Sequence, residues 1–380
     1  MLPKIYEFLS DFLRIFGDMG LNHSNRVYGL DVMRAAAIII VVLGHGATIA
    51  GPIFDWLPAI PLINGVELFF VLSGFLIGGI LIRTIEKEQR FTFKSLIQFW
   101  IRRWFRTLPN YYLVLIINIP LVYFAITPGD ASQINWKFFF FLQNFESGFV
   151  DFFWESWSLS IEEWFYISLP ILAFVFTKIL KIKWAILTTL LVLIIAPLAY
   201  RIYLSPVEYD SFWVGVEISK VVLTRLDAIV YGVLGAFIKF YYPNFWKALR
   251  WPGLIIGLFL AYLNIYLPSG PNQLYFRTIS FCVTSLGVML IIPMMDSIKN
   301  YRVPVIGRVI THISLISYGM YLVHLGIVAM LIETFFSLET TPERISAYTI
   351  YWAGTIALST LIFYVYERPM TNLRDRFRKS

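Results

Sequence analysis

The sequence predicts an all-α, polytopic membrane protein with about ten transmembrane helices and both termini in the cytoplasm. Hydrophobic residues make up 58% of the 380 residues and charged residues only 14%, whereas a soluble domain carries about 25% charged residues. Apolar stretches of roughly bilayer-crossing length recur along the whole chain rather than at one end. The Lys and Arg residues are also distributed unequally among the loops, which sets the orientation.

Ten apolar stretches approach the length that a helix needs to cross a bilayer. They fall at 35–52, 61–82, 108–126, 157–177, 184–203, 216–238, 251–267, 276–295, 314–336 and 345–366. The segment 134–145 is apolar but too short to cross, so we expect it to be re-entrant or interfacial.

The basic residues test this topology. With the N-terminus inside, 25 of the 31 Lys and Arg residues lie on the cytoplasmic side and four lie outside. The remaining two, Lys220 and Arg225, fall within a predicted span. Because cytoplasmic loops are enriched in Lys and Arg, this distribution favours cytoplasmic termini.

The two ends of the chain differ from the span region, 25–370. Residues 1–24 place apolar side chains such as Leu2, Ile5 and Leu9 at helical spacing, which predicts a helix lying in the cytoplasmic interface. Residues 371–380 form a basic tail. The net charge of +7 reflects topology, so we expect the lipid bilayer but no nucleic acid as a partner. The single cysteine, Cys282, excludes an internal disulfide, and no metal site is expected.

Arg34 and His45 lie eleven residues apart in one apolar segment. Three helical turns separate them, so they share a helix face roughly 16 Å apart, with Arg34 near the membrane edge and His45 near the midplane. Such groups are costly in lipid and indicate a functional site. Gly44 and Gly46 leave room beside the imidazole. Burial disfavours the charged form, so we expect a neutral histidine that can accept a proton; the alternative is a histidine bonded to a neighbouring helix.

A basic, tryptophan-containing segment separates the second and third predicted spans. Arg103 and Arg106 are spaced to share a helix face, with Arg102 adjacent, and paired guanidinium groups bind phosphate oxygens well. The alternative is a basic loop that only fixes topology or contacts anionic lipid headgroups. No Walker loop is present, so nucleotide hydrolysis is not implied.

Further polar groups occur within the spans. The second span holds Glu67 and Ser73, together with Gly74 and Gly78, which we expect to pack against the first span. The fourth span begins with Trp157 and carries two adjacent carboxylates, Glu162 and Glu163, of which at least one should face the interior.

Two later spans also contain polar side chains. In the sixth, Lys220, Arg225 and Asp227 indicate a structural charge network. In the ninth, Tyr321 and His324 can face one another, which indicates a hydrogen-bonded cluster.

A neutral base within a membrane and a phosphate-binding arginine cluster together favour acyl transfer. A CoA thioester is anionic at its nucleotide end and apolar along its arm, so the nucleotide could rest on the arginines while the arm runs toward His45. General-base assistance of this kind contributes roughly 10²–10⁴-fold. We expect acetyl-CoA or another acyl-CoA as a co-substrate and no permanently bound cofactor.

The chain resembles acyltransferase family 3, membrane O-acyltransferases with which bacteria acetylate or succinylate surface glycans. The resemblance rests on eight stretches in family order: 29–45, 65–78, 99–113, 140–145, 157–166, 225–236, 317–324 and 366–369. It implies that 25–370 is an acyltransferase domain in the bacterial cytoplasmic (inner) membrane. No extracellular esterase-like domain is expected after the tenth span.

The resemblance also implies roles for individual residues. His45 matches the essential histidine of the first span, with Arg34 as its basic partner, and Arg103 and Arg106 match the paired arginines associated with the acyl donor. Glu162 or Glu163 matches a functional carboxylate. The chain departs from the family at Glu67, where Asp is frequent, and at Trp164, where Gln is frequent, so acceptor contacts near Trp164 can differ.

We therefore predict an acyltransferase that moves an acyl group from cytoplasmic acyl-CoA to a hydroxyl of a glycan or lipid-linked sugar. The favoured acyl group is acetyl. The expected catalytic residues are His45, Glu162 and Glu163; those for the donor are Arg34, Arg102, Arg103 and Arg106; those for the substrate are Glu67, Ser73, Trp157, Tyr321 and His324. A transporter or flippase of sugars or lipids is the main alternative, and a sensor or scaffold without catalysis is the third.

Overall fold

The structure, a computed structural model, describes residues 26–54, 64–89, 91–148, 151–205, 216–267 and 274–377. The predicted interfacial helix in 1–24 and the last residues of the basic tail lie outside this part. The described residues contain helices and no β-strand, which confirms the all-α class. The α-helices are α2 (Tyr28–His45), α3 (Ala47–Ala50), α4 (Gly65–Glu88), α5 (Phe93–Tyr123), α6 (Ser156–Phe176), α7 (Ile182–Leu204), α9 (Val222–Arg225), α10 (Asp227–Tyr241), α11 (Pro243–Ala248), α12 (Arg250–Tyr266), α13 (Leu274–Arg277), α14 (Ile279–Ser297), α15 (Pro304–Val323), α16 (Met330–Phe335), α17 (Thr341–Ile362) and α18 (Arg368–Phe377).

Eight helical segments in the described part are long and apolar enough to cross a membrane, which confirms the polytopic architecture. Two of the ten predicted spans are shorter than the sequence pattern suggests. Their helices, α10 and α12, contain 15 and 17 residues. At a rise of about 1.5 Å per residue such helices fall short of a typical hydrocarbon core.

The first span begins and ends earlier than predicted. Its helix covers Tyr28–His45 rather than 35–52, and α3 follows after Gly46. His45 is therefore the last residue of α2, so the expectation that it lies mid-span is wrong. Gly46 is needed at this junction because a Cβ there would lie 2.6 Å from the ring of Tyr351.

The arginine segment belongs to a helix rather than to a connection between spans. Thr92 caps α5, which then runs for 31 residues to Tyr123. Arg102, Arg103 and Arg106 lie in its first half, so the alternative of a basic loop is wrong as a description of the backbone. The helix holds these side chains at the fixed angular spacing that a shared face requires.

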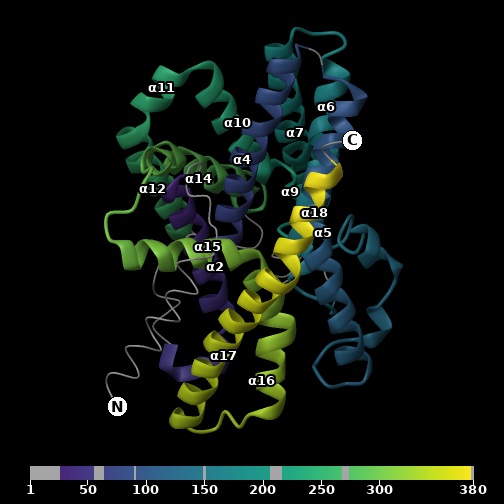
Figure 1. Cartoon of the computed structure of the whole chain (residues 1–380), viewed down its shortest axis with the longest axis vertical. Helices are drawn as coiled ribbons and strands as arrows, with labels where there is room; N and C mark the ends of the chain where they lie inside the picture. Colours follow the sequence, from purple (N-terminus) through teal and green to yellow (C-terminus); the bar gives the residue numbers. More distant parts are fainter. Residues whose placement is uncertain are drawn as a thin grey trace.

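Helices α4 and α10 cross at very close range near the centre of the molecule (Figure 1). A Cβ on Gly74 would overlap the carbonyl oxygen of Ile229, and one on Gly232 would overlap that of Val71. Gly78 similarly abuts Val233. The prediction of close packing is confirmed, but the partner is wrong: these glycines of α4 contact α10, not the first span.

Two buried ion pairs join the helices around this crossing. Arg201 of α7 is fully buried and binds both carboxylate oxygens of Asp227, at 2.9 and 2.7 Å. Arg225 pairs with Glu67 of α4. The prediction of a structural charge network is confirmed for Arg225 and Asp227, whose partners are Glu67 and Arg201. Lys220 takes part in neither ion pair.

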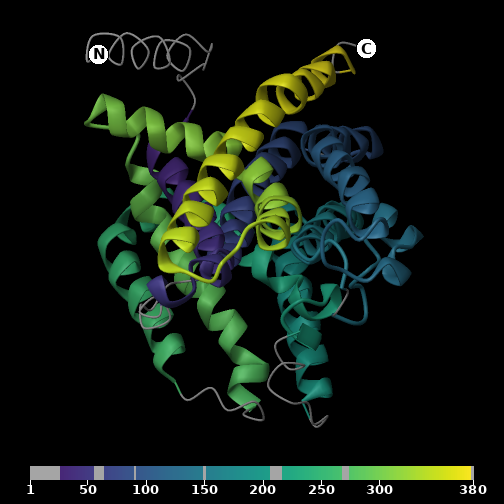
Figure 2. The same ribbon diagram turned by 90° about the horizontal axis from the view of Figure 1, so that it is seen from below.

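The C-terminal spans are interrupted by π turns. Residues His324–Ala329 form a π turn between α15 and α16, and Phe363–Glu367 form another between α17 and α18. Helices α17 and α18 make one long rod that crosses the molecule in both views (Figures 1 and 2). A π turn widens the helix locally and changes which backbone groups are paired.

The short aromatic segment does not cross the molecule as a helix. It contains a 3-10 turn, Trp136–Phe140, anchored by side chains of α5 and α6. Tyr111 and Tyr112 donate to the carbonyls of Phe138 and Phe139, each at 2.7 Å. Trp164 donates to the carbonyl of Phe141 at 3.0 Å, so the residue that departs from the family pattern anchors this segment.

Candidate active site

A cavity of about 290 Å³ opens between α2, α4, α5, α6 and α15. Its polar wall contains four arginines, Arg34, Arg83, Arg103 and Arg106, and a single carboxylate, Glu162. The opposite wall is apolar and includes Phe69, Phe70 and Leu76. An excess of cations beside an apolar wall suits a ligand with an anionic end and an apolar end.

Three of these guanidinium groups come from two helices that are distant in the chain, α2 and α5. Arg34 donates to Ser314 at 3.3 Å and lies 3.7 Å from Asp31. Arg103 donates to the Tyr166 hydroxyl at 2.9 Å, and its guanidinium lies 4.5 Å from the centroid of that ring. Arg106 and Arg103 are close enough to Arg34 to repel it electrostatically. The structure thus brings together three of the four residues predicted to bind the donor.

A second cavity, of about 410 Å³, adjoins the first. The two share Ile77, Ile80, Arg103 and Arg106 in their walls, and the second adds Arg102. It lies between the C-terminal half of α4 and the N-terminal half of α5. Arg102, the fourth residue predicted for the donor, therefore faces a continuation of the same basic space.

His45 is paired with a second histidine. Its Nδ1 lies 2.7 Å from Nε2 of His324, and the two rings stack at 14° with their centroids 5.0 Å apart. His324 is fully buried, whereas His45 has an exposed face. His324, predicted to contact substrate, instead contacts the histidine predicted to act as base.

The partners of His324 define where the protons lie in this pair. Its Nδ1 lies 2.8 and 3.0 Å from the carbonyl oxygens of Tyr321 and Met320. Carbonyl oxygens only accept, so Nδ1 of His324 carries the hydrogen and Nε2 of the neutral ring accepts. His45 must then donate from Nδ1, which leaves Nε2 of neutral His45 with a free lone pair. This is the form that a general base requires.

The π turn that begins at His324 is held by a buried glutamate. The amide of Gly326 donates to Glu155 Oε1 at 3.2 Å, and Glu155 is 1% exposed. The Tyr321 hydroxyl donates to the Glu155 carbonyl at 3.1 Å. Glu155 precedes α6, outside the motifs that marked the predicted site, so sequence reasoning did not find it.

Tyr321 stands between the arginine-lined cavity and the histidine pair. It lines the cavity, and its ring centroid lies 5.8 Å from that of His324. Its hydroxyl is 2.6 Å from Ser158 Oγ. Among the described residues that line the cavity, His45 is absent, and the contacts between the cavity and His45 run through Tyr321 and His324.

The two adjacent glutamates of α6 face different surroundings. Glu162 lines the cavity and accepts from the Tyr166 hydroxyl at 2.8 Å. Glu163 is buried and accepts from Thr107 at 2.7 Å, where α6 packs against α5. Glu162 therefore lies beside the arginines, while Glu163 joins two helices.

The remaining predicted residues divide between the cavity and other surroundings. Ser73 lines the cavity. Glu67 faces Arg225 and Ser285 instead, and Trp157 lines a separate small pocket. Sequence reasoning missed Arg83 and Ser158, which also line the cavity. Arg83 lies about three helical turns after Ser73 in the same helix, and this spacing could have indicated that the two side chains share a face.

The comparisons with known proteins identify the family of the chain. Residues 27–364 match the family model described as an acyltransferase domain. The chain is 31% identical over 372 residues to the peptidoglycan O-acetyltransferase OatA of Listeria monocytogenes, covering 90% of this chain and 56% of that protein. It is 34% identical over 172 residues to the putative peptidoglycan O-acetyltransferase YrhL of Bacillus subtilis, covering 42% of this chain and 25% of that protein. No solved structure matches the chain.

The chain spans about half the length of the first of these relatives. The family match, in contrast, covers most of the chain, from α2 to the π turn after α17. It includes the histidine pair and every residue that lines the arginine-lined cavity. The protein is a multi-pass membrane member of acyltransferase family 3.

Proposed function

We propose that the protein transfers an acetyl group from cytoplasmic acetyl-CoA to a hydroxyl of a cell-surface glycan, with His45 as general base. The observation that carries the proposal is the histidine pair, which leaves one ring nitrogen unprotonated next to a basic cavity. The relatives named as peptidoglycan O-acetyltransferases support an O-acetyl product and a glycan acceptor.

The two adjoining cavities suit the two ends of a CoA thioester. The phosphates would rest on Arg102, Arg103 and Arg106, because guanidinium groups bind phosphate oxygens bidentately. The apolar arm would follow the wall that Phe69 and Leu76 form. In this arrangement the acetyl end approaches Tyr321 and the histidine pair. Predicted topology places the arginine end of the cavities toward the cytoplasm.

The transfer step needs one proton acceptor and one leaving group. His45 Nε2 removes the proton from the acceptor hydroxyl as its oxygen attacks the thioester carbonyl. The carbon–sulfur bond then breaks, and the CoA thiolate leaves with the proton from His45. Throughout, His45 Nδ1 keeps its hydrogen and donates it to His324 Nε2, and this hydrogen bond fixes the ring and stabilises its protonated form.

The Tyr321 side chain has to move out of the way for the thioester to reach His45. Its hydroxyl is held by Ser158, so the ring moves only when that 2.6 Å hydrogen bond breaks. Donor binding would supply the free energy for this movement. Before this movement, Tyr321 keeps the donor's acetyl end apart from the base.

The test uses the full-length protein in lipid nanodiscs with acetyl-CoA and glycan oligosaccharides. We expect release of free CoA and formation of an O-acetyl ester, and we expect His45→Ala to abolish both. His312→Ala is the matched control, because His312 lies on the same α15 as the site but bonds Thr360 instead. It should keep most of the activity.

Retained turnover in His45→Ala would falsify the assignment of the base. A wild-type protein that neither binds acetyl-CoA nor is stabilised by it would favour the transporter or flippase alternative, because transport requires no acyl donor.

A further inference from the structure

Lys220 is a half-buried cation that belongs to none of the ion pairs described above. Its ammonium lies 5.9 Å from the centroid of the Trp157 ring. Within the described part of the chain, no carboxylate forms an ion pair with it. A half-buried lysine without an acidic partner is costly to keep and is characteristic of a site that receives a ligand.

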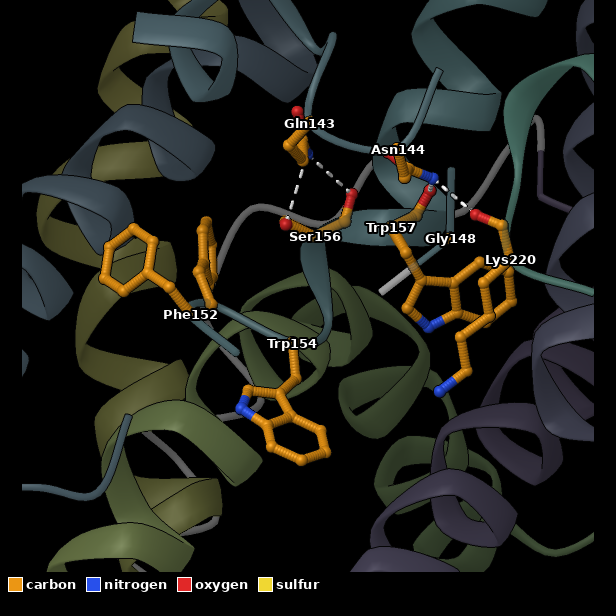
Figure 3. A pocket seen from close by; sticks show the side chains of 9 residues that line it. Gln143, Asn144, Gly148, Phe152, Trp154, Ser156, Trp157 and Lys220 are labelled. Atoms are coloured by element: carbon orange, nitrogen blue, oxygen red, sulfur yellow. Dashed lines mark hydrogen bonds between the residues drawn. The ribbon is translucent and has the colours of Figure 1, made fainter. Parts of the chain in front are cut away.

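Lys220 opens onto a small pocket, separate from the two arginine-lined cavities. The pocket has room for about 20 Å³ and also carries Gln143, Asn144, Trp154 and Trp157 in its wall. The indoles of Trp154 and Trp157 and the Lys220 ammonium point toward the same space (Figure 3). A space of this size holds one water-sized group, such as a hydroxyl or the tip of an acetamido substituent.

Two amide oxygens in the pocket wall have no donor. Asn144 donates from Nδ2 to the carbonyls of Trp157 and Lys220 at 2.9 and 2.6 Å (Figure 3). Both of its hydrogens are used, so the orientation of this amide is fixed. Asn144 Oδ1 and Gln143 Oε1 are buried without a hydrogen-bond partner, in residues that are 1% and 7% exposed. Buried acceptors of this kind require a hydrogen from a ligand or from water.

The pocket lies beside the arginine-lined cavity. Trp157 contacts the edge of Phe70, with ring centroids 6.1 Å apart, and Phe70 lines the arginine-lined cavity. A ligand on Trp157 would therefore lie next to the wall of the cavity that is proposed to hold the donor.

We propose that this pocket binds the acceptor as an N-acylated hexosamine, which deepens the proposed function and rests on it. The sugar ring lies against Trp157, and only its acetamido group enters the pocket, where the N–H donates to an unpartnered amide oxygen. Lys220 donates to an oxygen of the sugar. Aromatic walls with a few convergent polar groups have the composition of a small-ligand site, and indoles and amides match the apolar faces and polar edges of a sugar.

The test measures binding without any donor. Full-length protein in nanodiscs is titrated with chitotetraose, an N-acetylated oligosaccharide, and with cellotetraose, which lacks the acetamido groups. We expect chitotetraose to bind more tightly, because cellotetraose leaves an amide acceptor unpaired. We expect Lys220→Met and Trp157→Leu each to raise the Kd for chitotetraose about 10- to 100-fold, since a hydrogen bond from a charged group is lost or the platform is removed.

Lys178→Met is the matched control. Lys178 also lies over an aromatic ring, 4.5 Å from the Phe174 centroid, but at the other end of α6. This variant should bind chitotetraose as the wild type does. Lys220→Arg keeps the charge and should retain binding within about tenfold of the wild type, which separates loss of the cation from misfolding.

The proposal is overturned if wild-type protein does not bind chitotetraose, if Lys220→Met binds it unchanged, or if cellotetraose binds equally well. Binding that depends on Lys220 in a protein that turns over no acetyl-CoA supports this pocket and rejects the proposed function. The two failures are therefore distinguishable.

Discussion

His324 accepts the hydrogen bond from His45 Nδ1 that leaves Nε2 of His45 free to act as a base. With His324 replaced by Leu, Nδ1 of His45 loses its acceptor, and the ring can rotate and exchange its two tautomers. We expect His324→Leu to lower kcat about 100-fold with little change in the KM for acetyl-CoA. His324→Gln supplies an amide oxygen that can accept and should restore part of the loss. Steady-state kinetics of the two variants checks this, and equal losses in both would contradict the positioning role.

The arginines are expected to act on donor affinity. Replacing Arg103 or Arg106 by Ala removes a charge-assisted contact to phosphate, so each change should raise the KM for acetyl-CoA about 10-fold or more and leave acceptor KM nearly unchanged. Arg308→Ala, on an exposed part of α15, is the control. Competition assays with CoA and dephospho-CoA add a second readout, and equal inhibition by both would count against a phosphate contact.

At this scale the sequence predicted the arginines better than the histidine pair. Arg34 is costly in lipid wherever it lies, so its position in an apolar segment was enough to predict an interior site. The three-residue spacing of Arg103 and Arg106 was enough to predict a shared helix face. The partner of His45, in contrast, is 279 residues away. A single sequence carries no signal for which distant side chains meet. His324 could be recognised as a polar group in a span, but its role depended on the π turn.

Among the helices, α4 and α10 cross so closely that position 74 has no room for a side chain larger than that of glycine. Gly74→Ala would place a methyl group on the Ile229 carbonyl, so the helices must move apart. We expect a loss of about 1–3 kcal/mol in the free energy of unfolding and a Tm several degrees lower. Gly79→Ala is the matched control in the same helix, because its nearest neighbour is the flexible end of Arg83 at 3.3 Å. Similar Tm values for the two variants would refute this packing.

Element boundaries were less predictable than element type. The apolar residues of α3 extended the predicted first span to residue 52, although the helix ends at His45. Hydropathy registers apolar residues on both sides of Gly44 and Gly46 and does not detect a break between them. The same limitation made the third predicted span begin at residue 108 although α5 begins at Phe93, because a charged half-helix has no hydropathy signal.

The whole-molecule orientation rests on the asymmetry of basic residues and can be measured directly. We expect Glu339→Cys, in the exposed connection before α17, to react with a membrane-impermeant maleimide in intact cells. Arg302→Cys, before α15, should react only after the membrane is permeabilised. The parent protein, whose one cysteine is partly buried, reports the background. The reverse labelling pattern would invert the predicted topology and place the arginine-lined cavities outside.

The arrangement of helices could not be predicted to the same extent as their number and type. Close packing of Gly74 was predictable, but whether α2 or α10 receives it depends on chain connections that short loops alone do not determine. The ion pairs show the same point: Arg201 was not among the predicted intramembrane charges and neutralises Asp227 inside the bundle. Charge in a span predicts that a partner exists but does not identify it.

The central claim is that a CoA thioester reaches from the arginine-lined cavities to His45. A density map of the protein in nanodiscs with a non-hydrolysable thioether analogue of acetyl-CoA tests it most directly. The account predicts phosphate density against Arg103 and Arg106, a displaced Tyr321, and the acetyl carbon within about 6 Å of His45 Nε2, leaving room for one hydroxyl oxygen at about 3 Å from each. An analogue bound away from these arginines, or an acetyl group on the far side of an unmoved Tyr321, would contradict it.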